Sequence, residues 1–158
     1  LLGTAVRGAT VVDLFAGTGA LGFEALSRGA RRAIFAERHF PTADYLRRSS
    51  RELGLVDRVD VIPGDVLLWS RRMPPLSTES PWIIFVSPPW KFFHTRLAEI
   101  NSLLQALAAI APGKSRLVVE SDDQLAVESL PVRFGFHETE ESWDTRAVSP
   151  ATLHQKRL

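Results

Sequence analysis

The chain has 158 residues, of which 45% are hydrophobic and 23% charged, so it is long enough to fold as one domain with its own core. No apolar run approaches the roughly 20 residues of a membrane-spanning helix, and the absence of cysteine excludes disulfides and thiolate metal sites. A net charge of +1 is too small to indicate nucleic-acid binding by itself. The composition leads us to expect a cytoplasmic enzyme. We also expect it to be monomeric and to need neither a membrane nor a metal.

Segments with strand and helix patterns alternate along the chain. Strands are predicted, in order, at residues 10–15, 32–36, 59–62, 82–86 and 116–120. Helices are predicted between and after them, at residues 18–28, 41–53, 66–73, 97–111 and 124–129. This alternation is typical of an α/β fold, in which helices cover both faces of a parallel sheet. Two final strands, at 134–143 and 152–157, have a short connection and are predicted to form an antiparallel hairpin.

The first predicted strand runs directly into a glycine-rich turn with the spacing Gly17-x-Gly19-x-x-Gly22. Such a turn lets backbone approach a nucleotide-like ligand at a helix N-terminus. Asp13 lies four residues before Gly17, where a carboxylate would repel a pyrophosphate but attract an ammonium and a sulfonium. S-adenosylmethionine carries both groups. Two alternatives stay open: a tight turn without a ligand, and a nicotinamide-binding domain, which Asp13 disfavours.

Acidic residues stand at the carboxyl ends of three successive predicted strands: Asp13, Glu37 and Asp65. In an open α/β sheet, ligands bind outside these strand ends. Glu37 follows Gly17 at about the spacing expected of a carboxylate that binds a ribose diol, and Asp65 is placed to accept a hydrogen bond from an adenine amino group. Each residue alone is also explained as a loop cap or a solvated charge. Together they predict a nucleoside pocket.

The segment Ser87-Pro88-Pro89-Trp90 follows the buried strand predicted at 82–86. Its two prolines stiffen the turn and remove two N–H donors, so mostly acceptors remain beside the flat face of the tryptophan. Acceptors next to an aromatic platform suit a planar base whose amino group is held and oriented. The alternative is a rigid loop with a core tryptophan. Lys91 and Arg96 flank this turn and are candidates for contacting a nucleic-acid backbone.

The run from Asp13 to Ala30, DLFAGTGALGFEALSRGA, resembles the opening motif of the bacterial small-subunit ribosomal RNA guanine-N2 methyltransferases. The similarity continues to Glu37 and through residues 53–65, and it covers nearly the whole chain as a class I S-adenosylmethionine-dependent methyltransferase domain. We therefore expect residues 1–158 to form a single methyltransferase domain. The resemblance implies a Rossmann-like fold, with a seven-stranded, mostly parallel sheet in which one strand is reversed.

The resemblance also implies a reaction, the transfer of a methyl group from S-adenosyl-L-methionine to the exocyclic amine of guanine in RNA. The partner would be ribosomal RNA or the small-subunit particle. The expected cofactor-binding residues are Asp13, Phe15, Ala16, Gly17, Thr18, Gly19, Glu37, Arg38, Asp65 and Val66. The expected catalytic residues are Ser87, Pro88, Pro89 and Trp90, and the expected substrate-binding residues are Lys91 and Arg96. In this interpretation Ser87 and the Pro88 carbonyl accept hydrogen bonds from the amine, and Trp90 stacks on the base.

Two departures from the family pattern stand out. Amino-methylating relatives usually carry Asp or Asn where this chain has Ser87, although trimethylguanosine synthases share Ser-Pro-Pro-Trp. The family also has an N-terminal hairpin extension that helps to bind RNA, which we expect to be absent from this chain. Two further functions therefore stay open. One is methylation of another nucleic-acid amine, such as adenine in DNA or RNA, and the other is a cofactor-binding module that has lost catalysis.

Overall fold

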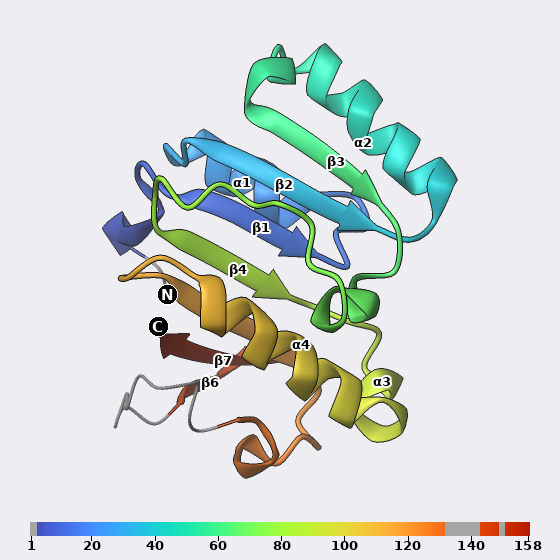
Figure 1. Ribbon diagram of the computed structural model, residues 1–158, viewed down its shortest axis with the longest axis vertical. Helices are drawn as coiled ribbons and strands as arrows, with labels where there is room; N and C mark the ends of the chain where they lie inside the picture. The colour runs from blue at the N-terminus through green and yellow to red at the C-terminus, as the bar shows by residue number, and fades with distance from the viewer. Residues whose placement is uncertain (1–2, 132–142, 149–150) are drawn as a thin grey trace.

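The computed structural model describes residues 3–131, 143–148 and 151–158, and the strands of these segments form one sheet (Figure 1). The strand order is β3-β2-β1-β4-β5-β7-β6. The strands are β1 (Thr10–Leu14), β2 (Arg32–Glu37), β3 (Val59–Pro63), β4 (Trp82–Val86), β5 (Arg116–Ser121), β6 (Asp144–Val148) and β7 (Ala151–Arg157). Strands β1 to β5 pair in parallel, whereas β7 pairs antiparallel with both β5 and β6. The predicted seven-stranded, mostly parallel sheet with a terminal hairpin is confirmed.

Helices cover both faces of this sheet. The helices are α1 (Ala20–Ser27), α2 (Phe40–Glu52), α3 (Lys91–Thr95) and α4 (Leu97–Ile110), with short 3-10 segments η1 (Gly3–Val6), η2 (Val56–Arg58), η3 (Val66–Ser70) and η4 (Val127–Ser129). In Figure 1, α1 lies behind the sheet and α4 lies in front of it. Leu26 of α1 and Leu46 of α2 share one core cluster, and Leu104 of α4 belongs to the other.

The predicted elements differ from the structure mainly near the ends of the chain and in the short helices. The helices predicted at 66–73 and 124–129 are the shorter 3-10 segments η3 and η4, and α3 was not predicted. Most of the strand predicted at 134–143 lies outside the described residues, and the first hairpin strand in the structure is Asp144–Val148. Trp143 just before it is buried and donates its indole N–H to the Pro131 carbonyl, 3.0 Å away.

The parallel register brings the carboxyl ends of four strands to one edge of the sheet. Leu14 pairs with both Ala36 and Val86, and Val86 pairs with Val119. The residues that follow these positions therefore lie at the same level.

Within residues 3–131, 143–148 and 151–158, no helix has the length and apolar character that a membrane span needs.

A close contact between α1 and β2 depends on Gly22. A Cβ at this position would overlap the Phe35 ring, lying 2.7 Å from Cζ and nearer still to Cε1. We expect Gly22→Ala to destabilise the fold by about 1–3 kcal/mol in urea unfolding, because the helix or the ring must shift. Gly113→Ala is the control, since its Cβ meets nothing within 4 Å. Equal stability of the two variants would show that the contact relaxes at no cost.

Candidate functional site

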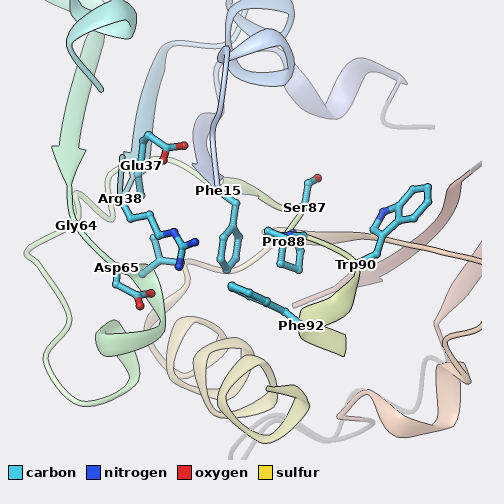
Figure 2. Close-up of a pocket in the computed structure, with 12 residues that line it drawn as sticks. Phe15, Glu37, Arg38, Gly64, Asp65, Ser87, Pro88, Trp90 and Phe92 are labelled. Atoms are coloured by element: carbon cyan, nitrogen blue, oxygen red, sulfur yellow. The ribbon is translucent and has the colours of Figure 1, made fainter. Parts of the chain in front are cut away.

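A cavity of about 480 Å³ opens at the carboxyl edge of the sheet (Figure 2). This volume lies within the usual range for small-molecule and cofactor sites. The last residues of β2 and the segments that follow β1, β2, β3 and β4 supply its lining. The lining consists of Phe15, Ala36, Glu37, Arg38, Gly64, Asp65, Val66, Ser87, Pro88, Pro89, Trp90 and Phe92. The structure thus brings five of the predicted cofactor residues together with the four predicted catalytic residues. It does not bring Asp13, Ala16, Gly17, Thr18 or Gly19 into this lining.

The glycine turn is shaped by residues in the left-handed backbone region. Phe15 has φ of 61°, a conformation that costs a residue with a side chain about 1–2 kcal/mol. Gly19 has φ of 77°, and a Cβ there would lie only 2.5 Å from Leu46 Cδ2, so glycine is needed on two grounds. The Gly17 N–H donates to Glu37 Oε2 at 2.9 Å. The turn is therefore tied to the end of β2.

Asp13 lies beneath the turn, with only 2% of its surface exposed. Its Oδ2 accepts a hydrogen bond from the Gly22 N–H at 3.0 Å, which anchors the first turn of α1. The pKa of Asp13 is raised to about 7, mainly by burial. The Gly22 hydrogen bond lowers it, and the nearby charges of Glu120 and Glu37 add smaller increases that are included in this value. The structure thus shows an anchor for the helix. A direct contact between Asp13 and a ligand ammonium stays a prediction.

Glu37 and Asp65 both line the cavity and both also bind backbone. Glu37 accepts from the His39 N–H at 2.7 Å through Oε1, in addition to its bond with Gly17. Asp65 is the N-cap of η3, and its Oδ1 accepts from the Leu67 N–H at 3.0 Å. A carboxylate offers more acceptor sites than these bonds occupy. The loop-cap interpretation therefore holds for Asp65 without removing it from the cavity wall.

Phe92, which sequence reasoning missed, forms an aromatic wall of the cavity. Its ring lies edge-on to that of Phe15, with centroids 6.3 Å apart. The guanidinium carbons of Arg38 and Arg96 lie 5.6 and 5.1 Å from its centroid. A flat apolar face with cations at its border suits a planar heterocycle. The available signal was the position of Phe92 two residues after Trp90.

The two predicted substrate-binding residues, Lys91 and Arg96, differ in how free their side chains are to bind a phosphate. Arg96 donates to both carboxylate oxygens of Glu99, at 2.8 and 2.7 Å, and this pairing raises its pKa. Its guanidinium also lies 3.7 Å from Asp65 Oδ2. Lys91 is exposed at the first position of α3. A phosphate would therefore reach Lys91 freely, but would compete with carboxylates for Arg96.

Ser87 begins the proline turn and has a partner that sequence reasoning also missed. The Ser87 hydroxyl donates to Glu120 Oε2 at 2.9 Å, across the β4–β5 boundary. Trp90 is 39% exposed and lies at the opposite end of the cavity from Arg38 and Asp65 (Figure 2). The signal for Glu120 was its place at the end of a predicted strand.

Among the described residues, no group of three or more histidine or acidic side chains is arranged to hold a metal.

The strand order and the site at the carboxyl edge define the class, a Rossmann-like domain with the fold of the S-adenosylmethionine-dependent methyltransferases. More specifically, the chain belongs to the family described as conserved hypothetical protein 95, whose sequence model matches residues 1–147.

The chain is similar in sequence to proteins named as ribosomal RNA methyltransferases. It is 32% identical over 93 residues to the putative rRNA methyltransferase YlbH of Bacillus subtilis (strain 168), a match covering 58% of this chain and 49% of that protein. It is 35% identical over 89 residues to the ribosomal RNA small subunit methyltransferase D of Haemophilus influenzae, covering 56% and 44%. The match thus spans less than half the length of either curated relative. These matches confirm the family resemblance seen in the sequence motifs.

A solved structure with the same fold is an RNA methyltransferase from Salinibacter ruber in complex with S-adenosyl-L-homocysteine. The TM-score is 0.65 at 15% sequence identity, covering 98% of this chain and 84% of that chain. At this identity the superposition establishes the fold alone.

Proposed function

We propose that the cavity binds S-adenosyl-L-methionine and that the domain transfers its methyl group to the exocyclic amine of a guanine in ribosomal RNA. The observation that carries this proposal is the position of Ser87. Ser87 lines the nucleoside-sized cavity and also begins the Pro-Pro-Trp turn, so cofactor and acceptor base would meet at this residue. Family membership and the ribosomal RNA methyltransferases among the relatives support the substrate class.

The lining fits this cofactor residue by residue. Glu37 offers carboxylate oxygens to a ribose diol, and Asp65 offers them to an adenine amino group. The Phe92 ring supplies a flat wall for the adenine. When bound, the cofactor supplies an electrophilic methyl group on a sulfonium. The carboxylates along this edge favour such a positive charge.

On the acceptor side, the chain contributes position and hydrogen-bond acceptors. The Ser87 hydroxyl and the Pro88 carbonyl would accept from the amine N–H groups and aim the nitrogen lone pair at the methyl carbon. Trp90 would stack on the base, and Lys91 would contact the RNA backbone. The reaction is then a direct displacement in which orientation supplies most of the rate.

The test is incubation of the purified full-length protein with isotope-labelled methyl donor and total RNA from a strain that lacks it. We expect label in one guanine of ribosomal RNA, located by mass spectrometry of nuclease fragments. Label in adenine, in RNA or in parallel DNA samples, would favour the other amine. Tight cofactor binding without transfer would indicate a module that has lost catalysis, and tighter binding of a nicotinamide cofactor would refute the proposed cofactor.

Glu37→Gln tests the cofactor end of the site. We expect a roughly tenfold to hundredfold rise in the dissociation constant for S-adenosyl-L-methionine, measured by calorimetry. Glutamine has a single, uncharged acceptor oxygen, so it cannot accept the Gly17 and His39 N–H groups on separate oxygens and accept from the diol as strongly as the carboxylate does. Glu52→Gln, on the exposed face of α2, is the matched control. Unchanged affinity in both variants would place the ribose away from Glu37.

A further inference from the structure

Ser87 and Glu120 form a pair that the parallel register of β4 and β5 creates. Val86 pairs with Val119, so the next residue on each strand lies beside the other. Phe85 and Val118, two residues from Ser87 and Glu120, both belong to the core cluster on the α1 side. Since side chains alternate along a strand, Ser87 and Glu120 also point to that side. The observed hydrogen bond of 2.9 Å between Ser87 Oγ and Glu120 Oε2 follows from this placement.

The carboxylate of Glu120 differs in its partner from the other two carboxylates at this edge, Asp13 and Glu37, which accept from backbone N–H groups. Asp13 accepts from the Gly22 N–H, and Glu37 accepts from the Gly17 N–H. Among the described residues, Ser87 is the hydrogen-bond partner of the Glu120 side chain. Both members of the pair also line a second cavity, of about 490 Å³, on the α1 side, so they are not sealed in the core.

We propose that Glu120 is the positioning residue that makes Ser87 an effective acceptor for the target amine, in place of the Asp or Asn of amino-methylating relatives. This inference rests on the proposed function. A free hydroxyl rotates and offers its proton or its lone pairs without preference. With its proton donated to a carboxylate, the Ser87 oxygen has both lone pairs left for N–H donors. The charge of Glu120 also strengthens the oxygen as an acceptor.

The pair also gives the departing proton a destination. The amine lone pair forms the N–C bond to the methyl carbon, while the electrons of the broken C–S bond remain on sulfur, which becomes a neutral thioether. The nitrogen, now positive, releases one proton to Ser87 Oγ as the hydroxyl proton of Ser87 passes to Glu120 Oε2. Serine ends as it began, and Glu120 holds the proton until solvent removes it.

The experiment is a cycle of variants assayed for kcat and KM with S-adenosyl-L-methionine and the RNA substrate. The proteins are the parent, Glu120→Gln, Ser87→Asn and the double variant, with Glu128→Gln on exposed η4 as the control. Glutamine keeps the shape and an acceptor for the hydroxyl but has no charge and takes no proton. We expect Glu120→Gln to lower kcat by roughly tenfold to a hundredfold and to leave both KM values within about twofold.

In the Ser87→Asn background, the same change at Glu120 should lower kcat less than about threefold, since an amide carbonyl needs no oriented hydroxyl. A purely structural role predicts equal losses in both backgrounds, and that result overturns the inference, as does full activity of Glu120→Gln. If the glutamine variant does not fold, Glu120→Asp supplies the same comparison by withdrawing the carboxylate one methylene from Ser87.

Failure of the proposed function gives a different pattern. If neither the parent nor Ser87→Asn methylates RNA, the proposed function is wrong and the inference falls with it. If Ser87→Asn alone is active, methyl transfer stands, but the Ser87–Glu120 pair does not replace the usual residue.

Discussion

Replacing Asp13 by asparagine is expected to stabilise the protein at pH 8 and to flatten the dependence of its stability on pH. Asp13 is 2% exposed, and burial is the main reason why its pKa rises from 3.8 to about 7. A neutral amide avoids the cost of burying a charge. Its carbonyl can still accept the Gly22 N–H that Asp13 Oδ2 accepts now.

The direction of the pH effect follows from where the proton is held. Below about pH 3.8 the carboxyl is protonated in both states, and it contributes no difference in stability. Between pH 3.8 and about 7 the unfolded chain loses the proton while the folded protein keeps it, so stability falls as pH rises. Above about pH 7 the Asp13 carboxyl is ionised in both the folded and the unfolded state, so the loss of stability no longer changes with pH. The rise in the pKa of Asp13 from 3.8 to about 7 corresponds to a loss of at most about 4 kcal/mol in the free energy of unfolding.

Urea unfolding of the parent and Asp13→Asn from pH 4 to 8 measures this effect. Asp123→Asn, at an exposed position, is the control for loss of a carboxylate. Parallel stability curves for the parent and Asp13→Asn would show that Asp13 is ionised throughout. Asp13→Ala should be less stable than Asp13→Asn, because it leaves the Gly22 N–H without its acceptor. It should also weaken cofactor binding by loosening the glycine turn.

Trp90→Ala is expected to lower kcat/KM for the RNA substrate by roughly tenfold to a hundredfold while cofactor affinity stays within about twofold. Trp90 is 39% exposed and lies at the end of the cavity away from Arg38 and Asp65 (Figure 2). Stacking a base on an aromatic ring contributes about 1–3 kcal/mol, and alanine removes all of it. Trp90→Phe should retain most of the activity.

Methyl-transfer kinetics and calorimetry together locate the tryptophan in the reaction. Tyr45→Ala is the matched control, because Tyr45 is an aromatic residue of α2 that is 49% exposed and does not line the cavity. Loss of cofactor affinity in Trp90→Ala, with unchanged turnover on RNA at saturating cofactor, would assign Trp90 to the cofactor instead of the base.

Local pattern in the chain was enough to predict strands β1 to β5 and β7, together with the acidic residues of the cavity. Strand positions follow from apolar runs such as 82–86, which is β4 in the structure, because buried parallel strands need such runs. The glycine turn was predictable because only glycine adopts φ of 77° at Gly19 without strain. Glu37 and Asp65 line the cavity as expected, since parallel strands end at one edge.

The amino-acid sequence alone therefore determined the fold class, the glycine turn and the residues at the strand ends. Only the tertiary structure decided what those residues contact. Ser87 and Glu120 are 33 positions apart, and their hydrogen bond exists because β4 and β5 pair in one register. Burial of Asp13 beneath α1 likewise sets its pKa. Contacts between distant segments depend on strand order and packing, which neither spacing nor periodicity encodes locally.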